Sequence, residues 1–189
     1  MRGLLLTICL SLALPAMAQE MILPDRPRVR IDTSEGSIVI ELDAQRAPLT
    51  SANFIRYVQD GFYEGLIFHR VINNFVAQGG GYTPDLQKKP AKYPPVKNEA
   101  DNGLKNKRGT IAMARTSDPD SATSQFFINV RNNLRLDWAP GNPGYTVFGE
   151  VIDGMYVVDS IAIEPTQNFM GHADVPVTPV IIKDVVRKK

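Results

Sequence analysis

The sequence predicts a mainly β protein, either a closed antiparallel barrel or a sandwich, with two helices. About eight short segments have the composition and period-two alternation of strands, and only two segments have helical spacing. The strands do not alternate regularly with helices, as they would in a parallel α/β fold. An antiparallel all-β architecture is therefore the expectation.

The first two strands form a predicted hairpin. From Arg28 onward, Val29 and Ile31 alternate with charged residues, and Ser34-Glu35-Gly36 then provides a turn into the apolar segment Ile38–Leu42. Six further segments have β character. These are Leu66–Val71, Phe75–Gln78, Gly109–Arg115, Gln125–Val130, Thr146–Ile152 and Val180–Val186.

The two predicted helices are separated by a long segment without periodicity. The first covers Pro48–Asp60, with proline near its start, apolar residues four positions apart, and Gly61 just after its end. The second covers Met155–Ile163. Between them, Tyr82–Arg108 is rich in Pro, Lys and Asn, and a loop of this length in a compact domain is usually functional or mobile.

The N-terminus has the features of a secretory signal. Residues 1–18 combine Arg2, an apolar core over Leu4–Leu14 and a small-x-small end at Ala16–Ala18. We expect a signal peptide at 1–18, a mobile leader at 19–27 and one domain at 28–189. Cleavage would remove Cys9, the single cysteine of the chain, and with it disulfide and thiol chemistry. This composition suits an oxidising compartment.

Charge and length limit the partners. The chain has 21 Lys and Arg against 20 Asp and Glu, and loss of Arg2 would leave it formally neutral. A neutral chain lacks the excess of cations that nucleic-acid binding requires. The apolar core near the N-terminus is too short to span a bilayer. We expect a monomer with neither nucleic acid nor a membrane as its partner.

Common catalytic motifs are missing from the sequence. It contains no Gly-x-Ser-x-Gly elbow, no His-Glu-x-x-His and no phosphate-binding Gly-Lys-Ser/Thr, and its two histidines, His69 and His172, lack a convincing triad context. The run Gly79-Gly80-Gly81 opens no helix and indicates a tight bend in a strand. We therefore expect neither a metal nor a cofactor.

Arg70 lies alone within an apolar segment of β character. A cation in such a segment is costly to bury without partners. It is either an ion-paired barrel residue or a group aimed at a carbonyl-bearing ligand. Apolar and amide side chains on neighbouring strands could surround such a ligand, although each alone could equally belong to the core. They are Phe75, Val76, Gln78, Met113, Gln125, Phe127 and Leu136.

The order of several motifs resembles the cyclophilin family of peptidyl-prolyl cis–trans isomerases. The resemblance covers about Val29 to Val186. It is carried by Phe68-His69-Arg70-Val71-Ile72, Phe75, Gln78-Gly79-Gly80-Gly81, Gly109–Arg115, Ser124-Gln125-Phe126-Phe127-Ile128 and Val147-Phe148-Gly149. Two further segments, Lys97–Leu104 and Ala114-Arg115-Thr116, resemble the bacterial branch, which includes exported periplasmic members.

This resemblance implies a closed eight-stranded antiparallel β-barrel capped by two α-helices. It implies that Arg70 is catalytic and that the substrate is a proline-containing peptide or an unfolded exported protein in the periplasm. The implied substrate-binding residues are Phe75, Val76, Phe127 and Leu136 as pocket walls, Ala114 and Arg115 as a peptide-pairing edge, and also Met113 and Tyr145. Gln78 and Gln125 would either orient Arg70 or form hydrogen bonds with the substrate backbone.

Three positions differ from the pattern of the family. Arg135 stands where cyclosporin-sensitive members have Trp, which implies weak binding of that drug, and Trp138 is close enough in sequence to replace it in space. Val76 replaces a more common Met, so that the pocket would be slightly wider. Asn73-Asn74 replaces a Pro-Gly turn, which asparagines can also form.

Three functions are compatible with this pattern. The first is an isomerase that assists the folding of exported proteins. The second is a proline-peptide binding or chaperone module with little turnover, and the third is a structural barrel of the cell envelope. Arg70, Gln78 and Phe127 together favour the isomerase, because binding alone does not require the cation.

Overall fold

The computed structural model describes residues 23–188 and contains ten strands, two α-helices and one 3₁₀ turn. In chain order they are β1 (Arg28–Thr33), β2 (Gly36–Leu42), α1 (Pro48–Gln59), β3 (Arg70–Ile72), β4 (Val76–Gly79), β5 (Thr110–Met113), β6 (Phe126–Asn129), η1 (Leu134–Leu136), β7 (Val147–Asp153), α2 (Met155–Ala162), β8 (Thr166–Phe169), β9 (His172–Pro176) and β10 (Ile182–Lys188).

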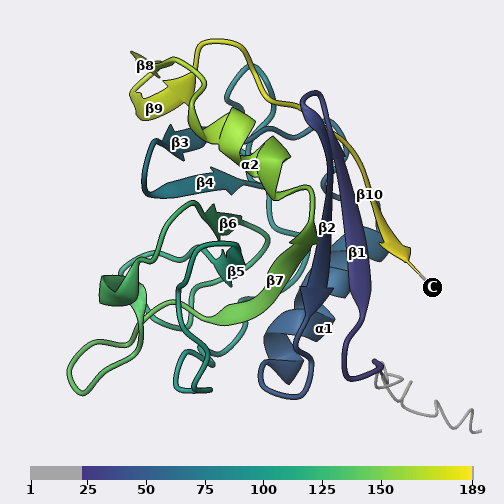
Figure 1. Cartoon of the computed structure of the whole chain (residues 1–189), viewed down its shortest axis with the longest axis vertical. Helices are drawn as coiled ribbons and strands as arrows, with labels where there is room; N and C mark the ends of the chain where they lie inside the picture. The colour runs from purple at the N-terminus through teal and green to yellow at the C-terminus, as the bar shows by residue number, and fades with distance from the viewer. Residues whose placement is uncertain (1–22, 189) are drawn as a thin grey trace, which may run out of the picture.

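Eight of the strands form one antiparallel sheet in the order β10-β1-β2-β7-β5-β6-β4-β3. Figure 1 shows the sheet curling around the molecule, with α2 in front of it and α1 behind. These eight strands are the ones that the sequence predicts, and both helices are confirmed to within one residue at either end. The β8–β9 hairpin forms a separate two-stranded sheet, which is not among the predicted strands.

The sheet is less completely closed than expected. Its edge strands β3 and β10 do not pair with each other. The segment before β3 meets the start of β10 and the two residues before it, with one isolated bridge between Ile67 and Ile181 and backbone hydrogen bonds of 2.7–3.0 Å between 65–68 and 180–182. The predicted strand Leu66–Val71 is thereby divided into a short closing contact and β3. The architecture is a curled sheet joined by this contact.

The interior of the sheet is filled by apolar side chains from the strands and both helices. Phe54 of α1 is fully buried, and its ring centroid lies 5.3–5.7 Å from those of Tyr63, Phe126 and Phe148. From α2, Val158 and Ile161 enter the same core. Each helix buries its apolar face against the inner side of the sheet, and the two helices thereby cover the core.

A second, smaller apolar cluster lies on the other face of the same sheet. It is formed by Val76, Ala112, Phe127 and Val147, with partly buried side chains packed against them. Because side chains alternate between the two faces of a strand, Phe126 and Ile128 belong to the interior core while Phe127 belongs to this outer cluster. The outer cluster carries the candidate site.

The expected signal peptide, residues 1–18, lies outside the described residues, as do residues 19–22 of the expected leader. Residues 23–27, which precede β1 in the sequence, lie beside the end of β2. The carbonyls of Asp25 and Pro27 accept backbone hydrogen bonds from Ala44 and Leu42 at 3.0 and 2.9 Å. This part of the leader is therefore attached to the sheet. No helix within 23–188 has the length and hydropathy needed to cross a membrane.

Candidate active site

Nine of the eleven predicted site residues line one hollow on the outer face of the sheet. Its volume is about 350 Å³, and it is lined by Arg70, Phe75, Val76, Gln78, Ala114, Arg115, Phe127, Leu136 and Tyr145. Phe127 is only 4% exposed, and Val76 is also buried, so they form its floor. The hollow combines an apolar floor with two guanidinium groups, Arg70 and Arg115, in its lining.

Strand register brings one half of the hollow together. Arg70 of β3 is opposite Gln78 of β4, Gln78 is opposite Phe127 of β6, and Phe127 is opposite Ala112 of β5. Residues in register share a face of the sheet. The turn between β3 and β4 is formed by Asn73-Asn74, as the sequence predicts, and Asn74 takes a left-handed φ of 55°.

The other half of the hollow comes from η1 and the segment before β7. The Tyr145 N–H donates to the Leu136 carbonyl at 2.9 Å, and its ring lies 5.7 Å from that of Phe127. Arg115 donates through Nε and Nη2 to the Gly144 carbonyl and lies over the Tyr145 ring at 4.4 Å. Arg115 is thus fixed as part of the wall.

Gly144 permits this arrangement. Its φ is +66°, and a Cβ at this position would lie 2.4 Å from the backbone nitrogen of Trp138. Any other residue would force apart the two segments that carry Leu136 and Tyr145. Trp138 itself is not among the residues that line the hollow, and its side chain is half exposed.

Arg70 is held by a row of amide side chains. Its Nη1 donates to Gln78 Oε1 at 3.5 Å, and Gln78 Nε2 donates to Gln125 Oε1 at 3.2 Å. Gln125 packs against Gly81, where a Cβ would lie 2.5 Å from its Cδ. The glycine run at the end of β4 bends the chain, as predicted, and its last residue, Gly81, makes room for Gln125.

Arg70 also has an acidic neighbour that no sequence motif indicates. Its Nε lies 3.7 Å from Oδ2 of Asp174 on β9, and both side chains are 39% exposed. Arg70 is therefore ion-paired and also lines the hollow, so that the pairing does not turn it away from the predicted ligand side. The β8–β9 hairpin is polar and short. Gly171 between its two strands is the one turn signal that could have indicated it.

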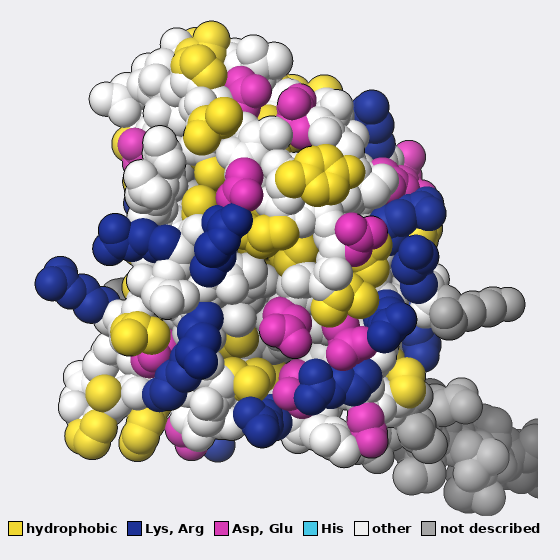
Figure 2. Space-filling view, in the orientation of Figure 1, with side chains coloured by type: hydrophobic (Ala, Val, Ile, Leu, Met, Phe, Trp, Pro, Cys, Tyr) yellow, Lys and Arg dark blue, Asp and Glu magenta, His cyan; other side chains and the backbone are white. Residues whose placement is uncertain are grey.

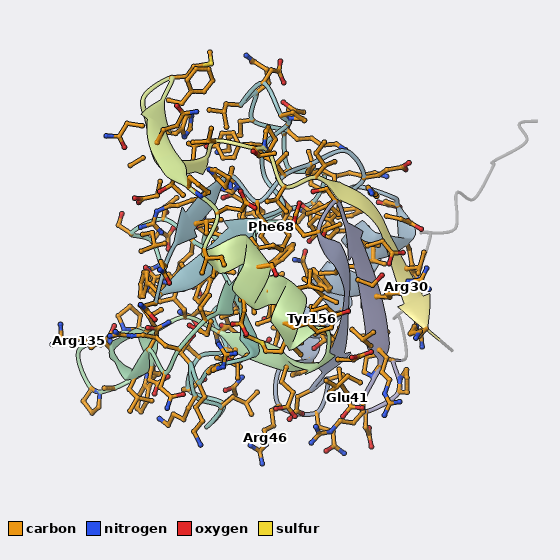
Figure 3. The ribbon with its side chains drawn as sticks, turned by 45° about the horizontal axis from the view of Figure 1, so that its top comes forward. Arg30, Glu41, Arg46, Phe68, Arg135 and Tyr156 are labelled. Atoms are coloured by element: carbon orange, nitrogen blue, oxygen red, sulfur yellow. The ribbon has the colours of Figure 1, made fainter. Side chains whose placement is uncertain are left out.

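Two predicted site residues lie outside the hollow. Met113 is buried in the interior core, because its neighbours Ala112 and Ala114 occupy the outer face. It reaches a different small hollow beside Thr50 and Val96, and we remove it from the expected substrate contacts. Gln125 does not line the hollow, and its Oε1 accepts the hydrogen bond from Gln78 Nε2. Arg135 is exposed on η1 and extends away from the sheet (Figure 3).

His69 precedes Arg70 and has the opposite environment. It is 5% exposed, its ring lies 4.5 Å from that of Tyr82, and its Nδ1 has no hydrogen-bond partner among the described residues. Burial, with smaller contributions from the charges of His172 and Arg70, lowers the pKa of His69 to about 4. At neutral pH it is an uncharged packing residue. It is not available as a proton carrier for chemistry in the hollow.

Comparison with known proteins identifies the family. The family model of the cyclophilin type peptidyl-prolyl cis-trans isomerases matches residues 28–187. The chain belongs to the cyclophilin family. This cyclophilin is 49% identical over 182 residues to the peptidyl-prolyl cis-trans isomerase A of Dickeya dadantii, covering 96% of the chain and 95% of that relative.

Other bacterial and solved relatives agree. The peptidyl-prolyl cis-trans isomerase B of Escherichia coli is 51% identical over 160 residues, with 83% of this chain and 97% of that protein covered. A crystal structure of a cyclophilin type isomerase from Cryptosporidium parvum, in the presence of the dipeptide Ala-Pro, has a TM-score of 0.74 and 30% identity. The match covers 86% of this chain and 99% of that one. The protein is therefore a peptidyl-prolyl cis–trans isomerase acting on proline-containing peptides.

Proposed function

We propose that this isomerase holds the substrate proline on the apolar floor of the hollow and that the Arg70 guanidinium promotes rotation about the preceding peptide bond. The observation that carries the proposal is the placement of Arg70 at the side of a hollow with an apolar floor, held there by Gln78. Phe75, Val76, Phe127 and Leu136 would contact the ring. Tyr145 and Arg115 would border it on the other side.

The chemistry of the reaction fits this set of side chains. The barrier to rotation of a peptide bond is about 18–20 kcal/mol and comes from amide resonance. The reaction makes and breaks no covalent bond, so it requires neither a nucleophile nor a proton carrier. In the twisted transition state conjugation is lost, and the charge on the carbonyl and the nitrogen differs from that of the planar amide. A fixed guanidinium with several donors can bind that state better than either planar isomer.

The pocket walls and the guanidinium have different tasks in this proposal. Tight binding of the proline ring alone stabilises both isomers and the transition state equally and accelerates nothing. A peptide would also need backbone contacts along the edge at Ala114 and Arg115. The Ala114 N–H already donates to the Gln125 carbonyl at 3.0 Å, so that we assign the Ala114 carbonyl to the substrate.

Turnover of a short proline peptide by Arg70→Ala tests the catalytic assignment. Loss of one preorganised donor group typically costs about 10²–10³ in rate. We expect kcat/KM to fall by about that factor while peptide binding changes only a few-fold. Arg30→Ala is the matched control, because Arg30 pairs with Asp32 at 2.9 Å on β1, away from the hollow. Equal rates for Arg70→Ala and wild type would refute the assignment and favour a binding module.

We further propose that the protein acts in the periplasm on exported proteins during their folding. The sequence features of residues 1–18 and the lack of cysteine after that segment support this location. Mass spectrometry of the protein recovered from the periplasmic fraction should give a chain beginning at Gln19. An unprocessed chain confined to the cytoplasm would contradict the proposal.

A further inference from the structure

We propose that Asp174 is a positioning residue for Arg70. The proposal rests on the catalytic role assigned to Arg70 above and extends it to the β8–β9 hairpin. Asp174 does not line the hollow. Oδ2 of Asp174 lies 3.7 Å from Nε of Arg70, whereas Gln78 accepts a hydrogen bond from Nη1 of Arg70. The guanidinium is thus contacted at two different nitrogens by residues from two different elements.

The contact at Nε leaves the outer part of the guanidinium to the substrate. Arginine has five N–H donors in a fixed planar arrangement, and a carboxylate paired at Nε approaches only that part of the group. Its long side chain has many rotamers in the absence of contacts. A carboxylate on one side and an amide on the other restrict those rotamers, so the remaining donors stay directed at the hollow before the peptide arrives.

The hairpin is anchored on both sides of Asp174. In Figure 1, β9 lies next to β3, the strand that begins with Arg70. Val175 is only 5% exposed and packs with Ile67 and Leu86. His172 packs against the ring of Tyr82 at 5.0 Å, and Tyr82 packs against His69, the residue before Arg70. The position of Asp174 relative to Arg70 is therefore fixed by buried contacts.

The backbone at Asp174 is also unusual. Its φ is 59°, in the left-handed region that residues other than glycine rarely adopt and that Asp and Asn tolerate best. Asparagine can therefore replace aspartate without a change in backbone preference, and alanine cannot. Asp174→Asn removes the charge alone, whereas Asp174→Ala combines loss of the contact with backbone strain.

A contribution to folding alone would have a different signature. Ion pairs between exposed side chains contribute little to stability and are screened by salt. Both partners here are 39% exposed. We therefore expect Asp174→Asn to leave the denaturant midpoint of unfolding unchanged. Its effect should appear in kcat, because misplacement of the guanidinium affects the transition state more than the bound planar peptide.

The experiment measures kcat and KM on a short proline peptide for wild type, Asp174→Asn and Glu64→Gln. Glu64 is an exposed acid just before the closing contact, and its variant controls for loss of one negative charge. We expect Asp174→Asn to lower kcat about five- to twentyfold with KM within about twofold, and Glu64→Gln to match wild type. High salt should reduce the difference between Asp174→Asn and wild type. A kcat for Asp174→Asn equal to that of wild type overturns the proposal.

The same substitution in the Arg70→Ala background separates the two proposals. If Asp174 acts through Arg70, Asp174→Asn has no further effect there, and the two changes are non-additive. If Asp174→Asn lowers kcat by the same factor in both backgrounds, the positioning role is overturned, while the catalytic role of Arg70 stands. If the Arg70→Ala variant alone turns over the peptide as fast as wild type, the catalytic role of Arg70 is overturned. The positioning role of Asp174, which depends on it, is then overturned as well.

Discussion

His69 and Arg70 are consecutive residues with opposite environments. The His69 ring is buried against Tyr82, and the Arg70 guanidinium lies at the hollow in contact with Gln78 and Asp174. Because side chains of an extended chain alternate in direction, neighbours in sequence can serve the core and the site separately. The shared position of His69 and Arg70 in one motif does not give them a shared chemical role.

Burial of His69 makes the stability of the protein depend on pH. The folded state lowers the pKa of His69 to about 4, from 6.5 for a free side chain. The unfolded state therefore binds a proton first as the pH falls, and the free energy of unfolding decreases between about pH 6.5 and pH 4. From pH 7 to pH 5 this residue should contribute a loss of about 2 kcal/mol.

Urea unfolding of wild type and His69→Phe at both pH values measures this contribution. The carboxylates titrate alike in the two proteins, so the difference between them reports His69. We expect the variant to lose about 2 kcal/mol less than wild type over this range. Parallel pH dependence in the two proteins would show that His69 accepts a proton without cost in the folded state.

Gly81 should matter for turnover through Gln125. A Cβ at this position would lie 2.5 Å from the Gln125 side chain, which can move away because it is flexible. Gly81→Ala should therefore displace Gln125 from Gln78 and lower kcat about three- to tenfold, with little change in the unfolding midpoint. Kinetics and a denaturation curve of the same preparation check both parts. Unchanged kcat would show that Gln125 does not help to orient Arg70.

At the scale of single residues, the sequence indicates most of the site but not how its members interact. Arg70, Gln78 and Phe127 are recognisable from ordered motifs. The contact of Arg70 with Asp174 joins residues more than a hundred positions apart and could not be predicted from a local pattern. Met113 faces the interior core, and the motif that contains it does not indicate which face of the strand it occupies.

At the scale of elements, α1 is completed by a residue from the long loop between β4 and β5. Its N-cap, Ala47, makes no side-chain capping hydrogen bond. The carboxylate of Glu99 accepts hydrogen bonds from the N–H groups of Leu49 and Thr50 at 3.0 and 2.9 Å, and from the Thr50 hydroxyl. A negative charge at this end of a helix also interacts favourably with the helix dipole.

Glu99→Ala should therefore destabilise the protein. Loss of a capping acceptor costs about 1–2 kcal/mol of unfolding free energy. Asp101→Ala is the control, because Asp101 is an exposed acid on the same loop. In chemical denaturation, the Glu99 variant should unfold at a lower denaturant concentration than both wild type and the control. If all three unfold at the same denaturant concentration, solvent caps the helix equally well.

Local signals explain which elements the sequence predicts well. The start of α1 at Pro48 and its end before Gly61 follow from proline and glycine preferences, and the bounds agree. The β8–β9 hairpin has strands of four and five residues with many polar side chains and pairs only with itself. Neither periodicity nor apolar composition marks such a hairpin, although one of its residues contacts Arg70.

At the scale of the whole molecule, one curled sheet serves two purposes. Its inner face and the helices enclose the core, while part of its outer face forms the floor of the hollow. All four residues of β6 are buried, because both faces of that strand are covered. A pattern of four consecutive buried residues does not reveal which face is the site. For this reason the sequence alone left a barrel and a sandwich open.

Charges of both signs are mixed on the face that carries α2 (Figure 2). Basic and acidic side chains alternate there without a large region of one sign (Figure 2). Tyr156 of α2 is exposed on this side, while Phe68 is buried beneath (Figure 3). The hollow around Arg70 combines apolar walls with a cation that other side chains contact.

The central claim is that the Arg70 guanidinium stabilises the twisted amide rather than the bound peptide. NMR exchange spectroscopy at saturating proline peptide measures the cis–trans interconversion rate on the protein itself, independently of affinity. We predict that Arg70→Ala still binds the peptide but interconverts it about 10²–10³ times more slowly than wild type. An on-enzyme rate equal to that of wild type would contradict the account.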